Sequence, residues 1–170
     1  DAWGISKDKM QEAFHTFKSV KRRMEVRGLE KGVTVIDDFA HHPTAVEETL
    51  KALKQKYEGK RLIAVFEPRS WSSRLAVFQE KYERAFAYAD YVIIAGVYNT
   101  SKASELGAVL DTDELVKQIE LQGKPSFSLP DADAIVAHLA PELKEPDVVA
   151  IMSNGGFGGI HDKILNVLKS

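Results

Sequence analysis

The hydrophobic residues of the chain fall either into short continuous runs or into longer stretches with helical spacing. The continuous runs predict strands buried on both faces, because a strand with one exposed face would alternate apolar and polar residues. An alternating segment at 20–27 and a short segment at 126–128 are weaker strand signals, and Gly28, Lys31 and Gly32 predict a turn. The runs expected to form buried strands are 33–36, 61–66, 91–96 and 147–152.

Between these runs, apolar side chains recur every three or four residues, as on one face of an amphipathic helix. Ser6 and Asp131 are suited to cap two of these helices, because their side-chain oxygens can accept the unpaired N–H groups of a first turn. Pro43 suits the first turn of another helix, since its missing N–H would have no partner there. The helices are expected at 6–18, 43–57, 75–89, 115–119, 131–139 and 160–168.

Strands that alternate with helices predict an α/β fold in which helices cover both faces of a parallel sheet. The carboxyl ends of all the strands would then lie at one edge, where open α/β sheets bind ligands. Polar loops at 37–42, 67–74 and 153–159 each follow an apolar run, so we expect them to gather there and place the candidate site on them. The loop through Asn99, Thr100 and Ser101 is also long and polar enough to have a function.

Composition limits the classes of function. The 170 residues are 44% hydrophobic, enough for one domain with a core, and the net charge of −2 gives no general case for binding nucleic acid or an anionic membrane. The basic cluster Lys18, Lys21, Arg22 and Arg23 favours a solvated face or linker over a nucleic-acid arm. The absence of cysteine excludes disulfides and thiolate metal sites, and no apolar run approaches the roughly 20 residues of a membrane span. We expect a cytoplasmic protein.

The acids and histidines of the first loop have both structural and functional interpretations. Asp37 and Asp38 could be turn formers and helix caps, or groups that face a ligand. His41 and His42 are adjacent and therefore point in different directions, and no further ligand spacing supports a metal site. A pair that contacts a ligand or fixes the loop is the preferred interpretation.

The other two loops favour anions. Arg69 and Arg74 could be surface charges, but a guanidinium group at a strand end beside Pro68 is well suited to a carboxylate or phosphate. The glycine-rich segment 153–159 lacks the Lys-Ser or Lys-Thr of a Walker motif. Its glycines can still let backbone amides approach an anion at a helix N-terminus.

Two separated patterns resemble the C-terminal domain of the Mur ligases, the ATP-dependent enzymes that build the peptidoglycan peptide. They are Phe17-x-x-Val20-x-Arg22-Arg23-x-Glu25 and Asp37-Asp38-Phe39-Ala40-His41-His42-Pro43-Thr44. Within the family, segments 67–70 and 152–161 most resemble the branch that joins a recovered murein tripeptide to UDP-N-acetylmuramate. The chain departs from that branch at 71–74, so the role of Arg74 is not carried over in detail.

The resemblance implies a Rossmann-like, mostly parallel sheet that closes over two other domains, an N-terminal UDP-sugar-binding domain and a central ATPase domain. Residues 1–18 are then expected to be the tail of the central domain, and 19–170 the C-terminal domain. The implied substrates are UDP-N-acetylmuramate and L-alanyl-γ-D-glutamyl-meso-diaminopimelate. ATP and Mg²⁺ are implied as cofactors, bound mainly by domains outside this chain.

The resemblance also implies roles for the loops, although it assigns no catalytic residue firmly and no metal ligand. The first loop would face the nucleotide and reacting centre, and the other two would bind substrate. Two alternatives stay open: a domain of the L-alanine-adding ligase, or a binding module without catalysis. The nucleotide-facing residues are Asp37, Asp38, Phe39, His41 and His42, and the substrate-binding residues are Arg69, Ser70, Arg74, Ser153, Asn154, Gly155, Gly156 and Phe157.

Overall fold

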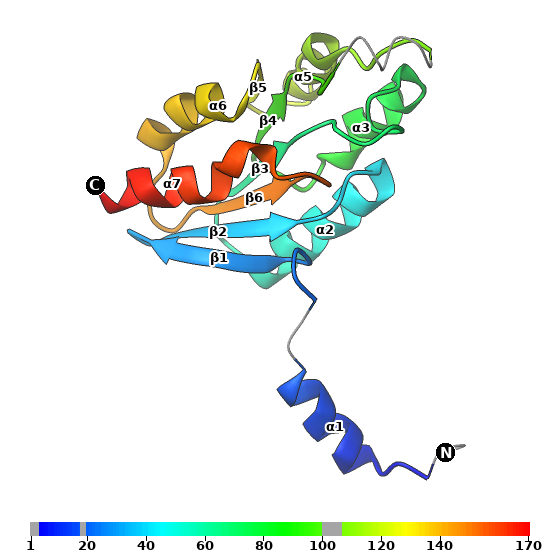
Figure 1. The fold of residues 1–170 in the computed structure, drawn as a ribbon, viewed down its shortest axis with the longest axis vertical. Helices are drawn as coiled ribbons and strands as arrows, with labels where there is room; N and C mark the ends of the chain where they lie inside the picture. The colour runs from blue at the N-terminus through cyan, green and yellow to red at the C-terminus, as the bar shows by residue number, and fades with distance from the viewer. Residues whose placement is uncertain (1–3, 18–19, 100–106) are drawn as a thin grey trace.

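A single sheet organises the chain in the computed structural model, which describes residues 4–17, 20–99 and 107–170. In these residues the sheet has six strands in the order β1-β2-β6-β3-β4-β5 (Figure 1). The mostly parallel α/β fold predicted from the sequence is confirmed. The strands are β1 (Glu25–Glu30), β2 (Val33–Asp38), β3 (Leu62–Phe66), β4 (Tyr91–Ala95), β5 (Ser126–Leu129) and β6 (Val148–Met152).

Helices cover both faces of the sheet, and each face has its own hydrophobic core. The core of one face contains side chains from α2, α3 and α5, and the core of the other contains side chains from α6 and α7. Alternate residues of the central strands enter the two cores, which explains why their sequences are continuously apolar. The helices are α1 (Lys7–Thr16), α2 (Pro43–Lys56), α3 (Gln79–Ala85), α5 (Thr112–Glu120), α6 (Ala132–Leu139) and α7 (Ile160–Lys169).

The first strand differs from the prediction in position and direction. β1 begins at Glu25 and runs antiparallel to β2, so the expectation that every strand ends at one edge is wrong for β1. Arg22 and Met24 have φ angles of 57° and 47°, which a strand does not accommodate. Gly28 lies inside β1 rather than in the turn; a Cβ there would stand 2.7 Å from Leu165, so glycine permits this close packing of α7.

The predicted long helix at 75–89 is also wrong. Leu75 is extended and forms a bridge with Val109, a 3₁₀ turn covers Ala76–Phe78, and α3 ends at Ala85. Phe86 is nevertheless fully buried. The apolar periodicity therefore reflects burial of a broken helix and the turn that follows it.

Helix α1 stands away from the sheet in Figure 1. Its N-cap is Ser6, as predicted, but it has no buried residues, and Phe14 is 80% exposed. The predicted boundary at residue 18 lies outside the described residues. No helix in the described ranges has the length and apolar character needed to cross a membrane.

Candidate functional site

The loops after β2, β6 and β3 begin side by side at one edge of the sheet. Asp38 of β2 is in register with Met152 of β6, and Met152 is in register with Phe66 of β3. Backbone hydrogen bonds continue past the strand ends: Ser153 donates to the carbonyl of Asp38 at 3.1 Å, and Glu67 donates to that of Met152 at 3.0 Å. The structure therefore brings the three predicted loops together.

The carboxylate of Asp38 is committed to contacts within the chain. It accepts hydrogen bonds from the backbone N–H groups of Met24 at 2.7 Å and Ala40 at 2.8 Å, and from the hydroxyl of Thr49 at 3.2 Å. With 3% of its surface exposed, Asp38 shapes the loop and fastens it to α2. This geometry corresponds to the turn-forming interpretation.

Asp37 is equally buried and meets a different set of groups. Its carboxylate accepts from the guanidinium groups of Arg22 at 3.3 Å and Arg27 at 3.5 Å. Nε2 of His161 lies 3.4 Å from Oδ1 of Asp37 without the alignment of a hydrogen bond. Burial lowers the pKa of His161, while the charge of Asp37 acts in the opposite direction. His161 is therefore neutral near pH 7.

Arg22 joins the first and third loops. Besides Asp37, its guanidinium group donates to the backbone carbonyls of Ser153 at 2.5 Å and Gly155 at 2.8 Å. The sequence of the basic cluster predicts a solvated face or linker. For Arg22 this interpretation is wrong, because its side chain is partly buried and its guanidinium group bonds to both loops.

Phe39 and His41 present a mixed aromatic and polar surface. The guanidinium groups of Arg22 and Arg23 lie 5.3 Å and 5.2 Å from the Phe39 ring, within cation–π range. Nδ1 of His41 lies 2.9 Å from the carbonyl oxygen of Phe39. That oxygen only accepts, so Nδ1 carries a proton in this contact.

Two aromatic residues, Tyr82 and Phe78, contact the two histidines of the first loop. The hydroxyl of Tyr82 donates to the carbonyl of His41 at 2.5 Å, and burial raises the pKa of Tyr82. The ring of His42 packs edge-on against Phe78, with centroids 5.0 Å apart. His42 is otherwise exposed at the N-terminus of α2.

Arg69 is oriented yet accessible. Its guanidinium group lies 3.9 Å from the ring centre of Tyr98, and one of its nitrogens lies 3.5 Å from a carboxylate oxygen of Glu67. Gly155 packs against it so closely that a Cβ would stand 2.2 Å from Arg69 Cδ. About a third of the Arg69 side chain, 32%, remains exposed. Among the predicted cations, it is well placed to bind an anion.

Arg74 and Ser70 are used mainly within the chain. Arg74 is buried and donates to the backbone carbonyls of Ser70 at 3.3 Å, Tyr98 at 3.0 Å and Asn99 at 3.3 Å. The hydroxyl of Ser70 donates to that of Ser73 and accepts from its N–H group. Arg74 therefore fastens the loop after β4 to the loop after β3.

The glycine-rich loop adds buried polar atoms. The hydroxyl of Ser153 donates to Glu67 at 2.5 Å and accepts from the N–H of Gly155 at 2.9 Å. Oδ1 of Asn154 is buried and has no hydrogen-bond partner among the described residues. An unpaired buried carbonyl oxygen is costly without a donor, so this atom is suited to accept a hydrogen bond from a ligand.

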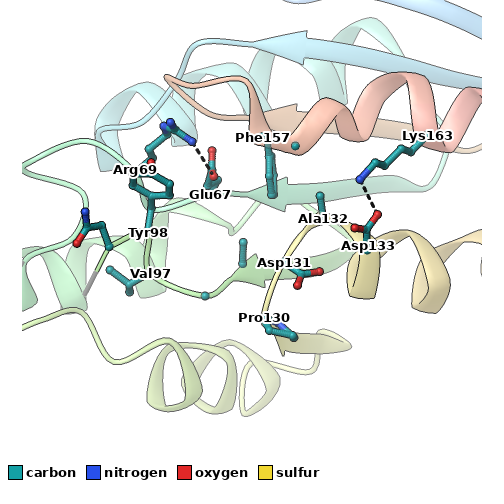
Figure 2. A pocket seen from close by; sticks show the side chains of 14 residues that line it. Glu67, Arg69, Val97, Tyr98, Pro130, Asp131, Ala132, Asp133, Phe157 and Lys163 are labelled. Atoms are coloured by element: carbon teal, nitrogen blue, oxygen red, sulfur yellow. Dashed lines mark hydrogen bonds and ion pairs between the residues drawn. The ribbon is translucent and has the colours of Figure 1, made fainter. Parts of the chain in front are cut away.

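Two pockets open between these loops. The β3–β4 pocket has a volume of about 380 Å³, and the α6–α7 pocket has about 430 Å³ (Figure 2). Arg69, Tyr98 and Asn99 line both pockets, which are therefore contiguous. The β3–β4 pocket is also lined by Ser70, Trp71, Arg74 and Asn154, and the α6–α7 pocket by Glu67, Ala95, Gly96, Val97, Pro130, Asp131, Ala132, Asp133, Phe157, Gly158 and Lys163.

Three residues outside the predicted set contribute to the site. Tyr98 orients Arg69, Glu67 pairs with it, and Arg22 links two loops. Glu67 immediately follows a buried strand, and this position in the sequence could have identified it as a site residue. The only comparable signal for Tyr98 was the polar loop in which it lies. Thr100 and Ser101 of that loop lie outside the described residues. In the described ranges no three His, Asp or Glu side chains are grouped so that they could hold a metal ion.

Comparisons with known proteins show the same fold and related sequences. Residues 22–155 match the family described as "Mur ligase, glutamate ligase domain". The chain is 36% identical over 162 residues to a UDP-N-acetylmuramate–L-alanine ligase of Caldanaerobacter subterraneus, covering 95% of this chain and 34% of that protein. It is 36% identical over 166 residues to a UDP-N-acetylmuramate–L-alanyl-γ-D-glutamyl-meso-2,6-diaminoheptandioate ligase of Escherichia coli, covering 97% and 34%.

A solved structure is also similar to this chain in fold and sequence. A murein peptide ligase from Psychrobacter arcticus superposes with a TM-score of 0.75 at 32% identity, covering 98% of this chain and 34% of that chain. The chain thus spans about a third of the length of the relatives it matches.

Proposed function

Because the chain belongs to the Mur ligase family, through the domain that its residues 22–155 match, we propose that it is the C-terminal domain of a longer ATP-dependent ligase. Members of this family are ATP-dependent amide ligases. In this proposal residues 19–170 form the C-terminal domain, and 1–18 are the tail of a central ATPase domain. The other domains bind ATP, Mg²⁺ and most of UDP-N-acetylmuramate.

The proposed reaction joins the tripeptide L-alanyl-γ-D-glutamyl-meso-diaminopimelate to UDP-N-acetylmuramate. The sugar carboxylate takes the γ-phosphoryl group of ATP, which releases ADP and forms an acyl phosphate. The alanine amine then attacks the carbonyl carbon and loses a proton, and phosphate leaves as the amide forms. Positioning of the amine is the contribution expected of this domain, because phosphoryl and acyl transfer depend strongly on orientation.

The observation that carries the proposal is the position of Arg69 between two contiguous pockets at the edge of the sheet. Tyr98 and Glu67 orient its guanidinium group, and its exposed part can pair with a carboxylate of the peptide. Asn154, with its unpaired Oδ1, lies on the adjacent loop and can accept a hydrogen bond from a peptide N–H group. Phe39 and His41 are proposed to face the nucleotide and reacting centre, with an orienting rather than a proton-transferring role.

The size of the pockets supports the tripeptide as acceptor, while the sequence identities to the two branches are equal at 36%. The chain is 32% identical to a solved murein peptide ligase, and the two pockets have room for more than a single amino acid. A second candidate is L-alanine, supported by the 36% identity to an L-alanine ligase. Both candidates are consistent with membership of the family.

A ligase assay of the full-length enzyme separates the candidates. We expect ATP- and UDP-N-acetylmuramate-dependent phosphate release with the tripeptide and little with L-alanine. The opposite preference would replace the first candidate with the second, and release with neither acceptor would favour a binding module. Arg69→Ala should raise the KM for the peptide about tenfold, the effect of losing one charge-assisted contact. Arg84→Ala, at an exposed position of α3, is the matched control.

A further inference from the structure

The α6–α7 pocket extends beyond the predicted site, and its charged groups lie at two ends. Figure 2 shows Arg69 and Glu67 towards one end, and Lys163 with Asp133 at the other. Asp131 lies immediately before the first residue of α6. Between the ends the lining is largely apolar or without a long side chain, with contributions from Phe157, Ala132, Ala95, Gly96 and Pro130. A matching ligand has a short aliphatic chain with charged groups at both ends.

Local structure holds the groups of the far end in place. Nζ of Lys163, on α7, lies 2.5 Å from Oδ1 of Asp133, in the first turn of α6. Asp131 is the N-cap of α6, and its Oδ1 accepts from the N–H of Ala134 at 2.9 Å. The far end therefore offers one cation and two carboxylates.

The ion pair at this end is open to a ligand. The side chains of Lys163 and Asp133 are 40% and 78% exposed. An ion pair this exposed contributes little to folding, because water screens both charges. A ligand that brings its own carboxylate and ammonium groups can pair with both residues and bury part of their charge.

We propose that the α6–α7 pocket binds the distal amino-acid group of the acceptor peptide, with Lys163 pairing with its carboxylate and Asp131 and Asp133 with its ammonium group. This inference rests on the tripeptide function proposed above. The third residue of that peptide, diaminopimelate, is an aliphatic chain with an amino-acid group at its far end. It matches the charges at the far end and the apolar middle of the pocket.

The pocket, with Arg69 at one end and Lys163 at the other, suits a ligand longer than a single amino acid. Strands β6 and β5 are separated by three strand spacings, about 14 Å in all, and the segment after β6 crosses this gap, since a Cβ on Gly158 would stand 3.1 Å from Ala132 Cβ. A tripeptide backbone spans about 10 Å, and the side chain of its last residue adds several more. In this proposal Lys163 is a specificity residue for the longer acceptor, because L-alanine has no distal carboxylate for it to bind.

The test uses the full-length ligase and two tripeptides that end in diaminopimelate or in L-lysine, which lacks the distal carboxylate. Lys163→Ala should raise the KM for the diaminopimelate peptide about tenfold with little change in kcat, as expected for a lost charge-assisted contact. The KM for the lysine peptide should stay within about twofold, since that peptide has no group for Lys163 to bind. Lys163→Arg should restore the discrimination between the peptides.

Lys169→Ala is the matched control, because Lys169 lies on the same helix, pairs with Glu30 at 3.6 Å and does not line the pocket. The inference is overturned if Lys163→Ala leaves the KM for the diaminopimelate peptide unchanged, or raises both KM values equally. Those results would leave the tripeptide function intact. If the unmodified enzyme uses L-alanine and neither tripeptide, the proposed function fails and this inference fails with it.

Discussion

The hydroxyl of Ser153 donates a 2.5 Å hydrogen bond to the carboxylate of Glu67, although the two residues are 86 positions apart in the chain. Both are buried, and each is the first residue after a central strand. The bond joins the loop after β6 to the loop after β3. Because Glu67 also pairs with Arg69, the Ser153–Glu67 bond contributes to the position of the main candidate for substrate binding.

Ser153→Ala should destabilise the chain by about 1–3 kcal/mol, because it leaves the buried Glu67 carboxylate with one partner fewer. The free energy of unfolding in urea measures the loss. Ser128→Ala is a suitable comparison: its hydroxyl donates one 3.1 Å bond to Thr112, so its removal should cost no more than about 1 kcal/mol. Equal losses of unfolding free energy in the two variants would show that the Ser153–Glu67 bond contributes no more to stability than the Ser128–Thr112 bond.

Arg74→Ala and Arg69→Ala should act on different properties. Loss of Arg74 removes a buried guanidinium group that donates to three backbone carbonyls and joins two loops, and we expect about 2–3 kcal/mol of destabilisation. Loss of Arg69, which is partly exposed, should cost less than about 1 kcal/mol and mainly weaken peptide binding. Urea unfolding and peptide KM distinguish the two. A larger folding loss for Arg69→Ala would mean that its main role is structural.

Gly155→Ala should reproduce the kinetic effect of Arg69→Ala. The added methyl group would stand 2.2 Å from Arg69 Cδ and Nε, and a flexible side chain relieves such a clash by moving away. We therefore expect the KM for the peptide to rise about five- to tenfold, with unfolding free energy changed by less than about 1 kcal/mol. Arg84→Ala, at an exposed position of α3, should leave the KM unchanged. An unchanged KM in Gly155→Ala would mean that the orientation of Arg69 is not needed for binding.

His161 should make stability depend on pH. Burial lowers its pKa in the folded chain below the ordinary 6.5, so the unfolded chain binds more protons as the pH falls below about 6.5. Folding stability attributable to His161 is therefore complete above that pH and decreases towards its lower folded pKa. The contribution changes by at most about 1.4 kcal/mol per pH unit.

The measurement is urea unfolding at about pH 7.5 and about pH 5.5 for the wild type and for His161→Gln, which cannot titrate. The other histidines are common to both proteins, so the difference between their pH dependences isolates His161. The wild type should lose more stability on acidification. An equal loss in both proteins would contradict the assignment.

Arg22→Lys should not be conservative. Lysine retains a charge near Asp37 but lacks the planar fork that reaches both the carboxylate and the carbonyls of Ser153 and Gly155. We expect the free energy of unfolding to fall by about 1–2 kcal/mol. This loss is smaller than for a fully buried arginine, because 30% of the Arg22 side chain is exposed. Arg23→Lys, whose side chain is exposed, should change stability by less than about 0.5 kcal/mol.

The elements with a local signal were predictable. Pro43 begins α2 and Asp131 caps α6, because capping and first-turn preferences depend only on neighbouring residues. The segment 75–89 was mispredicted because its spacing records burial, and burial does not require an unbroken helix. The direction of β1 was also out of reach, since pairing of β1 with β2 is a contact that residue periodicity does not encode.

The sequence by itself determined the central parallel strands and the position of three polar loops at their carboxyl ends, because apolar runs and strand–helix alternation follow from local patterns. Only the tertiary structure decided what each loop residue does. It buried Asp37 and Asp38, brought Arg22 to Gly155, and placed Lys163 across a pocket from Arg69. These relationships depend on which distant segments pack together and on where each side chain finds a partner of opposite polarity.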